Sequence, residues 1–571
     1  MCGIAGLYSL ADRAIEPFEI TRMCDAQAHR GPDDAGCVLL APLGRSKESR
    51  WRKVTARDRS RAVPDLQAPD ELNQTVGSVA QGAYRLALGH RRLSILDLSM
   101  AGHQPMANQA KTVWLTYNGE IYNYLDLKKE LAGKGHRFVS GSDTEVLLHL
   151  YEEYGAACVE QLNGMFAFAL WDDRSETLLL ARDRYGIKPL YYAEIGRKLV
   201  FASEVKALLT VQDFPREVNL PALADYFTFQ NTFGDATLFK GVRLLEPGHL
   251  MTVKAGHVEC RRYWDFNFEP MEDAGEERCR ERLRCVLEDT IKRQLVSDVP
   301  VGAYLSGGMD SGSITAMAAA SAPRLMTFTG GFDLTNVSGF EAGFDERQDA
   351  EVLSALFGTE HYQMVFHAGD LEWALPRVIW AIEDLRVGMC YPYYYTARLA
   401  SRFVKVVLGG TGGDEIFAGY PWRYRMAEGA RSEQDFLTRY YRYWNRLVPA
   451  DQRAQFFSPQ VLRETGGHDP YDSFRRVAEP ARSVRDPIRR ALYFEAKTFL
   501  HGLLVIEDKL SMAHSLESRV PLLDHALVDF VTTLPTRYLI NHQWDKNPSG
   551  DENLAGKYLF RRAMEGVLPD R

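Results

Sequence analysis

The chain begins Met1-Cys2-Gly3-Ile4-Ala5-Gly6-Leu7, and the cysteine at position 2 is its most informative residue. Removal of the initiator methionine would leave Cys2 with a nucleophilic thiol and a free α-amino group on one residue. An α-amine has a pKa of roughly 7.7–8.0, so part of it is unprotonated near neutrality and can act as a base. A nucleophile activated by an N-terminal amine is a known catalytic arrangement. The stretch therefore predicts a catalytic N-terminus, with a small residue in an N-terminal strand as the alternative.

The composition is that of a soluble globular protein with several domains. Its 571 residues exceed one ordinary core, which predicts two to four domains. Hydrophobic residues make up 46% and charged residues 25%, and the net charge of −8 gives no reason to expect nucleic acid as a partner. The eight cysteines include no Cys-x-x-Cys pair. No apolar run approaches the roughly 20 residues of a membrane span, and the start does not resemble a signal peptide. We therefore expect a cytoplasmic protein without a membrane partner.

Up to about residue 215 the sequence alternates between short strands and turns. Residues 112–117 predict a strand that ends at Asn118-Gly119-Glu120, a turn signal. Ser142 or Asp143 precedes an apolar-periodic stretch over 145–154, which predicts a capped helix.

Five short blocks in this half follow one another in a distinctive order. They are Cys2-Gly3-Ile4, Arg30-Gly31-Pro32-Asp33, His90-Arg91-Arg92-Leu93-Ser94-Ile95, Asn118-Gly119-Glu120-Ile121-Tyr122-Asn123 and Ser142-Asp143-Thr144-Glu145. In this order they resemble the class II glutamine amidotransferases. The resemblance implies an α+β N-terminal-nucleophile hydrolase fold, with stacked antiparallel sheets between helices, over residues 1–215.

The resemblance also implies a role for each matching residue. Cys2 would attack the side-chain amide of glutamine, and Asn118 with the Gly119 N–H would stabilise the oxyanion of the tetrahedral intermediate. Arg92 would bind the α-carboxylate, ideally through two parallel hydrogen bonds, and Glu120 and Asp143 would bind the α-ammonium. The implied glutamine-binding residues are Arg92, Leu93, Ile95, Asn118, Gly119, Glu120 and Asp143. The structural alternatives are a surface ion pair for Arg92, a hairpin turn at Asn118-Gly119 and a helix cap at Asp143.

After a connecting region over 216–265, strands alternate with helices. Residues 301–305 predict a buried strand, and Ser306-Gly307-Gly308-Met309-Asp310-Ser311 leads from it into a helix. A glycine loop between a strand and a helix N-terminus binds phosphate, because free N–H groups and the helix dipole converge there. The Gly-Lys-Ser/Thr ending of a Walker A loop is absent. A tight strand-to-helix turn is the structural alternative.

This loop resembles the pyrophosphate-binding loop of the ATP pyrophosphatases, which implies an α/β parallel-sheet domain over 266–571. A second glycine loop, Gly409-Gly410-Thr411-Gly412-Gly413-Asp414-Glu415, follows an apolar strand over 403–408. Ligands of open α/β sheets bind beyond the carboxyl ends of the strands, where both loops would meet. The implied ATP-binding residues are Tyr304, Ser306, Gly307, Gly308, Asp310, Ser311, Gly330, Gly409, Gly410 and Asp414. Asp310 and Asp414 would also hold Mg²⁺.

With the block over 507–524, both halves together resemble the glutamine-dependent asparagine synthetase family. The resemblance implies ATP and Mg²⁺ as cofactors, glutamine as nitrogen donor and a carboxylic acid as acceptor. Nitrogen would pass through an internal tunnel to an acyl-adenylate, forming an amide and releasing AMP and pyrophosphate. Family analogy also suggests a homodimer.

The second loop departs from enzymes that make asparagine, which have Ser-Gly-Glu-Gly-Ser-Asp-Glu at this place. Gly409 and Thr411 replace the serine and the first glutamate, so any base must come from elsewhere, with Glu415 or Glu383-Asp384 as candidates. The presumed acceptor segment, 382–395, contains four tyrosines in place of small hydroxyl residues. They favour a larger or more apolar acid than aspartate, although buried tyrosines are also common in cores.

Two further stretches differ from the family. Residues 41–80 form a long Arg-rich segment, which predicts a solvated loop, with a contact for a carrier or partner protein as the alternative. The chain stops at Leu568-Pro569-Asp570-Arg571, before a family lysine that contacts the phosphates. We interpret this as a sequence cut short; Lys557 or Lys509 as a substitute is the alternative.

We therefore predict an ATP- and glutamine-dependent, amide-forming enzyme whose acceptor is not aspartate. One alternative is a true asparagine synthetase. Others are a plain glutaminase and a catalytically dead homologue with a regulatory or interaction role.

Overall fold

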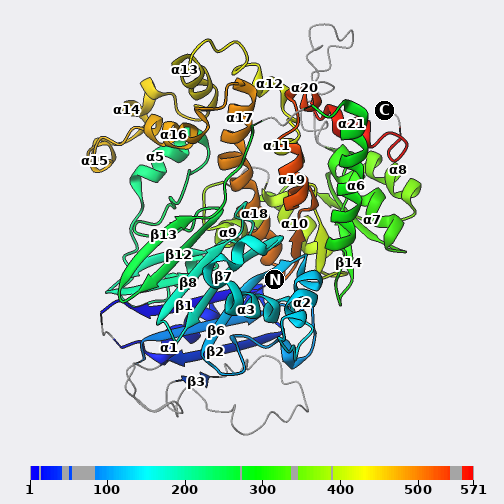
Figure 1. Cartoon of the computed structure of the whole chain (residues 1–571). Coiled ribbons are helices and arrows are strands. Elements are labelled where there is room, and N and C mark those ends of the chain that lie inside the picture. Colours follow the sequence, from blue (N-terminus) through cyan, green and yellow to red (C-terminus); the bar gives the residue numbers. More distant parts are fainter. Residues whose placement is uncertain are drawn as a thin grey trace, which may run out of the picture. The chain divides into compact units, whose positions relative to one another are not determined.

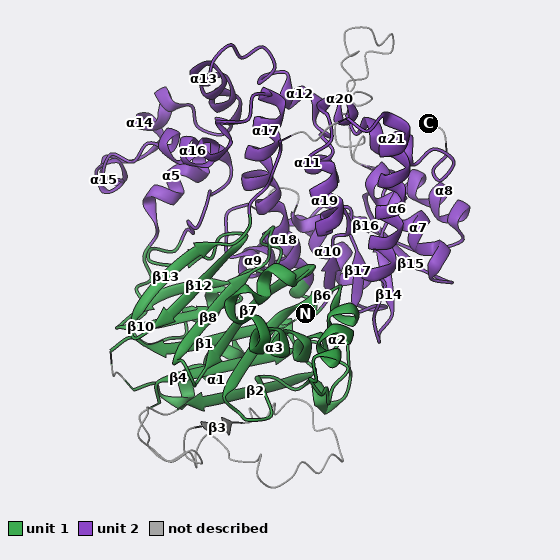
Figure 2. Cartoon of the chain, viewed as in Figure 1, with its two compact units in different colours: residues 1–217, 239–264, 512–515 green, residues 218–238, 265–511, 516–571 purple. Residues whose placement is uncertain are grey.

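The structure is a computed structural model that describes residues 2–11, 14–40, 51–54, 84–269, 273–335, 345–386, 390–540 and 556–569 (Figure 1). The chain forms two compact units, coloured green and purple in Figure 2. The first contains Met1–Glu217, Phe239–Trp264 and Met512–Ser515. The second contains Val218–Leu238, Asp265–Ser511 and Leu516–Arg571. The predicted connecting region over 216–265 is thus divided between the two units.

The first unit contains two antiparallel sheets. Their strand orders are β11-β9-β10-β1-β4-β2-β3 and β13-β12-β8-β7-β6-β5. The strands of the first sheet are β1 (Gly3–Ser9), β2 (Asp34–Leu40), β3 (Trp51–Val54), β4 (Leu86–Arg92), β9 (Tyr191–Ile195), β10 (Lys198–Ala202) and β11 (Arg243–Leu244). Those of the second are β5 (Met106–Ala107), β6 (Val113–Ile121), β7 (Gly164–Asp172), β8 (Thr177–Arg182), β12 (His249–Lys254) and β13 (His257–Arg262).

These sheets stack face to face between helices. A buried cluster joins Ile4 and Phe201 of the first sheet to Trp114 and Met251 of the second. Helices α2 (Tyr124–Gly133) and α3 (Asp143–Tyr154) cover the other face of the second sheet through a separate cluster. Helix α1 (Pro17–Asp25) packs on the first sheet at Gly89, where a Cβ would lie 2.4 Å from Cys24 Sγ. A short helix, α4 (Val205–Leu208), also belongs to this unit. The predicted N-terminal-nucleophile hydrolase architecture is confirmed.

The second unit is built on a five-stranded parallel sheet in the order β16-β15-β14-β17-β18. Its strands are β14 (Val301–Tyr304), β15 (Met326–Phe332), β16 (Glu360–Phe366), β17 (Val406–Leu408) and β18 (Glu517–Arg519). The predicted parallel α/β class of this half is therefore confirmed.

Helices surround this sheet and continue beyond it. Ala397 of α10 packs with Phe328 and Val407 of the sheet, and Leu305 packs with Leu353 of α8. The first helices of the unit are α5 (Leu220–Phe229), α6 (Glu276–Gln294), α7 (Met309–Ser321), α8 (Arg347–Phe357), α9 (Asp370–Ile382), α10 (Cys390–Ala400), α11 (Gly413–Ile416) and α12 (Pro421–Tyr424). The later ones are α13 (Glu433–Trp444), α14 (Arg453–Phe456), α15 (Pro459–Glu464), α16 (Pro470–Ala478), α17 (Pro487–Glu495), α18 (His501–Met512), α19 (His525–Val531), α20 (Thr536–Leu539) and α21 (Tyr558–Ala563).

Among the described residues, no helix is both long and apolar enough to cross a lipid bilayer. The Arg-rich stretch over 41–80, with its predicted solvated loop or carrier contact, lies outside the described residues except for the backbone of β3.

Candidate active sites

Cys2 lies at the start of β1, a central strand of the first sheet, and is only 7% exposed. Its backbone nitrogen donates to Asn118 Oδ1 at 2.8 Å, and its carbonyl accepts from Arg30 Nε at 3.0 Å. Gly3 pairs with Arg91 on β4, so Arg92 lies on the neighbouring strand close to this end of β1. Two hydrogen bonds of its backbone and the strand pairing of Gly3 therefore hold Cys2 in place.

Asn118 and Gly119 lie inside β6, so the predicted turn at Asn118-Gly119-Glu120 is wrong. Gly119 pairs with Phe166 of β7, and a Cβ at Gly119 would lie 2.2 Å from the Met165 carbonyl oxygen. The glycine thus permits a close approach of two strands rather than a change of chain direction. Asn118 Nδ2 is buried without a hydrogen-bond partner among the described residues. An amide donor in this state, whose own oxygen binds the Cys2 nitrogen, is suited to receive an oxyanion.

The other predicted glutamine-site residues are buried around this strand. The Arg92 guanidinium donates to the carbonyls of Leu96, Asp97 and Ser99. Asp143 Oδ2 accepts from the Tyr117 hydroxyl at 2.8 Å and from the Ile121 N–H at 3.0 Å, on either side of Asn118. Ser142, not Asp143, caps α3, because its side chain accepts from the Thr144 N–H. The exposed fractions of Leu93, Ile95, Glu120 and Asp143 are all 6% or less.

In the second unit, the predicted phosphate loop joins β14 to α7. Ser306 Oγ accepts from the Gly308 N–H at 3.0 Å and lies 2.9 Å from Ser311 Oγ. The Ser306 N–H donates to Ser311 Oγ at 3.0 Å. These hydrogen bonds all lie within the loop, so the side chains of the Ser-Gly-Gly-x-Asp-Ser sequence themselves stabilise its conformation.

Lys557 joins the two glycine loops. Its Nζ lies 2.7 Å from Asp310 Oδ2 and also contacts Asp414 Oδ1. Burial raises the pKa of Asp310 to about 6, while Lys557 opposes that rise. Lys509, the other lysine considered for this place, instead donates to the Ile382 carbonyl at 2.9 Å and pairs with Glu383 at 2.7 Å. Of the two lysines, Lys557 is therefore the one that reaches the loops.

A cavity of about 570 Å³, here called the loop cavity, opens between the two loops. The predicted ATP-site residues that line it are Tyr304, Ser306, Gly308, Asp310, Ser311, Gly330, Gly409, Gly410 and Asp414. Gly307 is not among its lining residues; a Cβ there would lie 2.7 Å from Asp349 Cβ. Nearly all of the predicted residues thus gather around one space.

The candidate bases differ in their surroundings. Glu383 pairs with Lys509, and Asp384 pairs with Arg386, so neither faces the loops. Glu415 lines the loop cavity, where burial raises its pKa to about 7, and it accepts from the Tyr420 hydroxyl at 2.8 Å.

Glu507, to which sequence reasoning gave no role, lies on α18 and faces the same space. Its Oε1 accepts from the Ser518 hydroxyl, and its Oε2 is buried without a hydrogen-bond partner among the described residues. A Cβ at Gly409 would lie 2.8 Å from Glu507 Oε1. The sequence could not show this carboxylate opposite the substituted loop, because α18 is distant from the loop along the chain.

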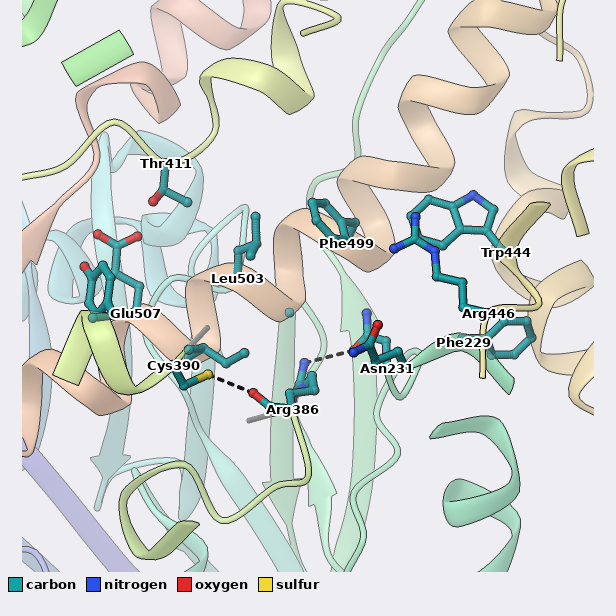
Figure 3. Close-up of a pocket in the computed structure, with 14 residues that line it drawn as sticks. Phe229, Asn231, Arg386, Cys390, Thr411, Trp444, Arg446, Phe499, Leu503 and Glu507 are labelled. Carbon is teal, nitrogen blue, oxygen red and sulfur yellow. Dashed lines mark hydrogen bonds between the residues drawn. The ribbon is translucent and has the colours of Figure 1, made fainter. Parts of the chain in front are cut away.

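A second cavity of about 370 Å³, the aromatic cavity, adjoins the first (Figure 3). Both are lined by Tyr393, Thr411, Leu503 and Glu507. The labelled side chains extend from Thr411 and Glu507, at one end of the cavity, toward a second end formed by aromatic side chains and an arginine (Figure 3). That end holds Phe229, Trp444 and Arg446.

Within the aromatic cavity, Arg386 pairs with Asp384 and donates to Asn231 Oδ1 at 2.9 Å. Arg446 stacks on Trp444, with its guanidinium carbon 4.2 Å from the ring centroid. Of the four tyrosines in the presumed acceptor segment, Tyr393 lines this cavity, while Tyr395 donates to the Asp370 carbonyl and stacks on Trp373.

The fold and these sites define a two-part enzyme that joins a glutamine amidotransferase to a nucleotide-dependent synthetase. A glutamine amidotransferase domain model matches residues 71–264, and an asparagine synthase model matches residues 282–571. The chain is 33% identical to asparagine synthetase [glutamine-hydrolyzing] 1 of Bacillus subtilis, over 100% of this chain and 85% of that protein. It is 30% identical to amidase chry2 of Gibberella zeae, over 90% of this chain and 84% of that protein.

The chain therefore belongs to the asparagine synthetase family. It is a ligase-type enzyme that forms a C–N bond with glutamine as the nitrogen donor, and its family uses ATP.

Proposed function

We propose that this protein transfers the amide nitrogen of glutamine to the carboxyl group of an acid with an apolar or aromatic body, and not to aspartate. The observation that carries this proposal is the aromatic cavity. It adjoins the phosphate loop, and Thr411 lines it where asparagine-forming enzymes have a glutamate.

Glutamine hydrolysis is assigned to residues 1–215. After removal of Met1, the Cys2 thiolate attacks the glutamine side-chain amide, and the Cys2 amine carries the thiol proton to the leaving nitrogen. Asn118 Nδ2 and the Gly119 N–H stabilise the oxyanion. Arg92 and Asp143 bind the α-carboxylate and the α-ammonium. Water then cleaves the thioester, so each cycle yields glutamate and one ammonia. The burial of Cys2 and its bond to Asn118 support this assignment.

Activation of the acid is assigned to residues 266–571. ATP would occupy the loop cavity, with its phosphates against Ser306–Ser311 and Lys557. The acid carboxylate attacks the α-phosphorus, and the bond to pyrophosphate breaks. Asp310 and Asp414 fit a divalent cation, because their carboxylates already converge on one positive charge, that of Lys557. Mg²⁺ held there would neutralise phosphate charge.

The amide-forming step needs a base that the loop no longer supplies. Glu507 is our candidate, because it faces both cavities and its Oε2 is buried and unpartnered among the described residues. It would accept a proton from the nitrogen nucleophile as the nitrogen attacks the acyl carbon and AMP leaves. Glu415 is the alternative base; it lines the loop cavity but not the aromatic cavity.

The body of the acid would lie in the aromatic cavity. Burial of the apolar body against this lining would stabilise the bound acid. The lining offers few partners for a second carboxylate, because it includes Phe229, Trp444, Phe499 and Ile506. Arg386 is already neutralised by Asp384. Arg446 remains as one cationic group at the end of the cavity away from Thr411, where only the polar tail of a long acid would reach it.

Aspartate as the acceptor is the second candidate, and it is favoured by the names of the Bacillus subtilis relatives. The third is a homologue without synthetase activity. Pyrophosphate release, measured with ATP, glutamine and a panel of carboxylic acids, separates the three. Release with aromatic or long-chain acids supports our proposal; release with aspartate alone, or with no acid, contradicts it. A Cys2→Ala variant should keep activity with free ammonia and lose activity with glutamine.

A further inference from the structure

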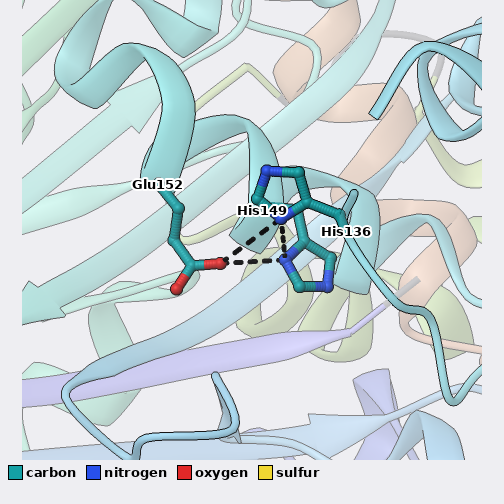
Figure 4. A group of neighbouring side chains, drawn as sticks. All are labelled: His136, His149 and Glu152. Carbon is teal, nitrogen blue, oxygen red and sulfur yellow. Dashed lines mark hydrogen bonds and ion pairs between the residues drawn. The ribbon is translucent and has the colours of Figure 1, made fainter. Parts of the chain in front are cut away.

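Two histidines and a glutamate cluster in the first unit, where α2 is joined to α3. His136 lies in the segment after α2, and His149 and Glu152 lie three residues apart on α3, a spacing that places them on one helix face. Figure 4 shows the three side chains pointing toward one another. No role in glutamine or ATP binding has been assigned to any of them.

Three ligand atoms of this cluster form a small triangle. His136 Nδ1 lies 3.0 Å from His149 Nδ1, which lies 2.8 Å from Glu152 Oε2. The third edge, from His136 Nδ1 to Glu152 Oε2, is 3.9 Å. A tetrahedral Zn²⁺ with ligand bonds of about 2.0–2.2 Å separates its ligands by about 3.3–3.6 Å. The observed edges lie on both sides of that separation, so small side-chain adjustments suffice to receive an ion.

The outer ring nitrogens face carboxylates. His136 Nε2 lies 2.8 Å from Glu153 Oε1, and His149 Nε2 lies 3.9 Å from Glu145 Oε1. A proton on His136 Nε2 would be donated to Glu153, and a proton on His149 Nε2 would face the Glu145 charge from beyond hydrogen-bond distance; both Nδ1 lone pairs would then be directed inward. Histidines that bind metals are commonly oriented by a carboxylate on the outer nitrogen, as Glu153 orients His136 here. Without an ion, only one proton can lie between the two Nδ1 atoms. If His149 Nδ1 carries that proton, Glu152 Oε2 competes with His136 Nδ1 to accept it.

Glu152 is also held in position. Asn108 Nδ2 donates to Glu152 Oε1 at 2.8 Å, which leaves Oε2 toward the histidines. Asn108 Oδ1 in turn accepts from the N–H groups of Thr112 and Val113 at the start of β6. The side chains of His136, His149 and Glu152 are 15%, 13% and 23% exposed, so an ion can enter from solvent.

We propose that His136, His149 and Glu152 bind one divalent transition-metal ion of the Zn²⁺ type, with water completing the coordination. Two imidazoles and one carboxylate favour Zn²⁺ over Mg²⁺, whose preferred ligands are all oxygen. The ion would fasten the segment after α2 to α3, and its role would be structural. Because α3 begins at Asp143, this site would stabilise the helix that carries one side of the glutamine site.

The test uses the full chain with Cys2→Ala, Cys260→Ser and Cys285→Ser, here called the parent, so that neither the reactive thiol nor the exposed thiols of the described residues compete for metal. The protein is stripped with a chelator and titrated with Zn²⁺ by calorimetry and with Co²⁺ by visible absorption. The variants are His149→Gln, Glu152→Gln and Glu153→Gln. The matched control is His249→Gln, because His249 and Glu246 also form an i, i+3 pair, at 3.7 Å, but are not part of the cluster.

We expect the parent and the control to bind one more equivalent of Zn²⁺ than His149→Gln, with the intense Co²⁺ bands of a four-coordinate site. Glu152→Gln should weaken binding at least tenfold, and Glu153→Gln about 10–100-fold. Zn²⁺ should raise the Tm of the parent but not that of His149→Gln. Equal binding by the parent, His149→Gln and Glu152→Gln would overturn the proposal, as would the absence of Zn²⁺ binding by the parent. If His149→Gln does not fold, the proposal is judged by whether Glu152→Gln binds Zn²⁺ at least tenfold more weakly than the parent.

Discussion

Replacing Glu507 by glutamine tests the assignment of the base directly. The change preserves the shape of the side chain and an oxygen that can accept from Ser518, and it removes only the charge and the basic oxygen. General-base catalysis contributes about 10²–10⁴ in rate, so the barrier to amide formation should rise by about 2.7–5.4 kcal/mol. Adenylation should continue, because the proposal gives Glu507 a role only in the attack of nitrogen on the acyl group.

Stability should move in the opposite direction from activity. In the native protein Glu507 Oε2 is buried without a partner among the described residues, and such a group costs about 1–3 kcal/mol. The neutral amide is less costly to bury than a carboxylate. We therefore expect the free energy of unfolding of Glu507→Gln to equal or exceed that of the parent, which would rule out misfolding as the cause of lost activity.

The assay separates the two chemical steps. Acid-dependent ATP–pyrophosphate exchange reports adenylation, and amide formation with free ammonia reports nitrogen attack without involving Cys2. Glu415→Gln is the matched control, since it lines only the loop cavity. A loss below tenfold in amide formation, or a parallel loss of exchange, would refute the assignment; a large loss in Glu415→Gln alone would move the base to that residue.

Three further predictions concern other parts of the chain. Asn118→Ala removes the buried amide donor beside Cys2, so glutamine hydrolysis should fall about 10²–10³-fold while ammonia-dependent synthesis persists; equal loss with both nitrogen sources would count against it. Lys557→Met leaves Asp310 and Asp414 without their shared cation. We expect the free energy of unfolding, measured with urea, to fall by up to about 3–5 kcal/mol and the KM for ATP to rise. Lys557→Arg, which keeps the charge, is the control and should show smaller effects. The Asp225 carboxylate raises the pKa of His468 above its ordinary value. That stabilisation is therefore full below about pH 6.5 and is lost as pH rises through the folded-state pKa, so the Tm should fall with pH more in the parent than in His468→Gln.

Much of the fold could be predicted because its signals are local. The phosphate loop is one: an apolar strand, glycines and a helix start within a dozen residues, and the side chains of Ser306 and Ser311 shape the loop themselves. The turn predicted at Asn118-Gly119-Glu120 failed for a physical reason. Glycine permits both a turn and a close strand approach, and the strand that contacts Gly119 lies elsewhere in the sequence.

The candidate sites depended more on distant residues. The contact between Lys557 and Asp310 joins positions 247 residues apart, so the sequence could offer Lys557 and Lys509 only as alternatives. The aromatic cavity takes its side chains from α5, α10, α13 and α18 and from the segments between them. Thr411, Tyr393 and Glu507 lie in stretches that the sequence marks, but Phe229, Trp444 and Arg446 do not, so the sequence could not show that these side chains surround one space. Glu507 begins the block over 507–524, but its position beside Gly409 depends on the fold and not on the block itself.

Two substitutions in the second glycine loop have a common explanation. Gly409 provides the space that Glu507 occupies, because any side chain at 409 would begin 2.8 Å from Glu507 Oε1. Thr411 is shorter than a glutamate and lines both cavities at the point where they meet. On the proposed function, a carboxylate on α18 instead of on the loop would keep a base beside the acyl group without a long side chain at position 411, where the two cavities share their lining. Under this proposal an acid larger than aspartate would need both of these conditions, so the assignment of the base and the choice of acceptor are tested together.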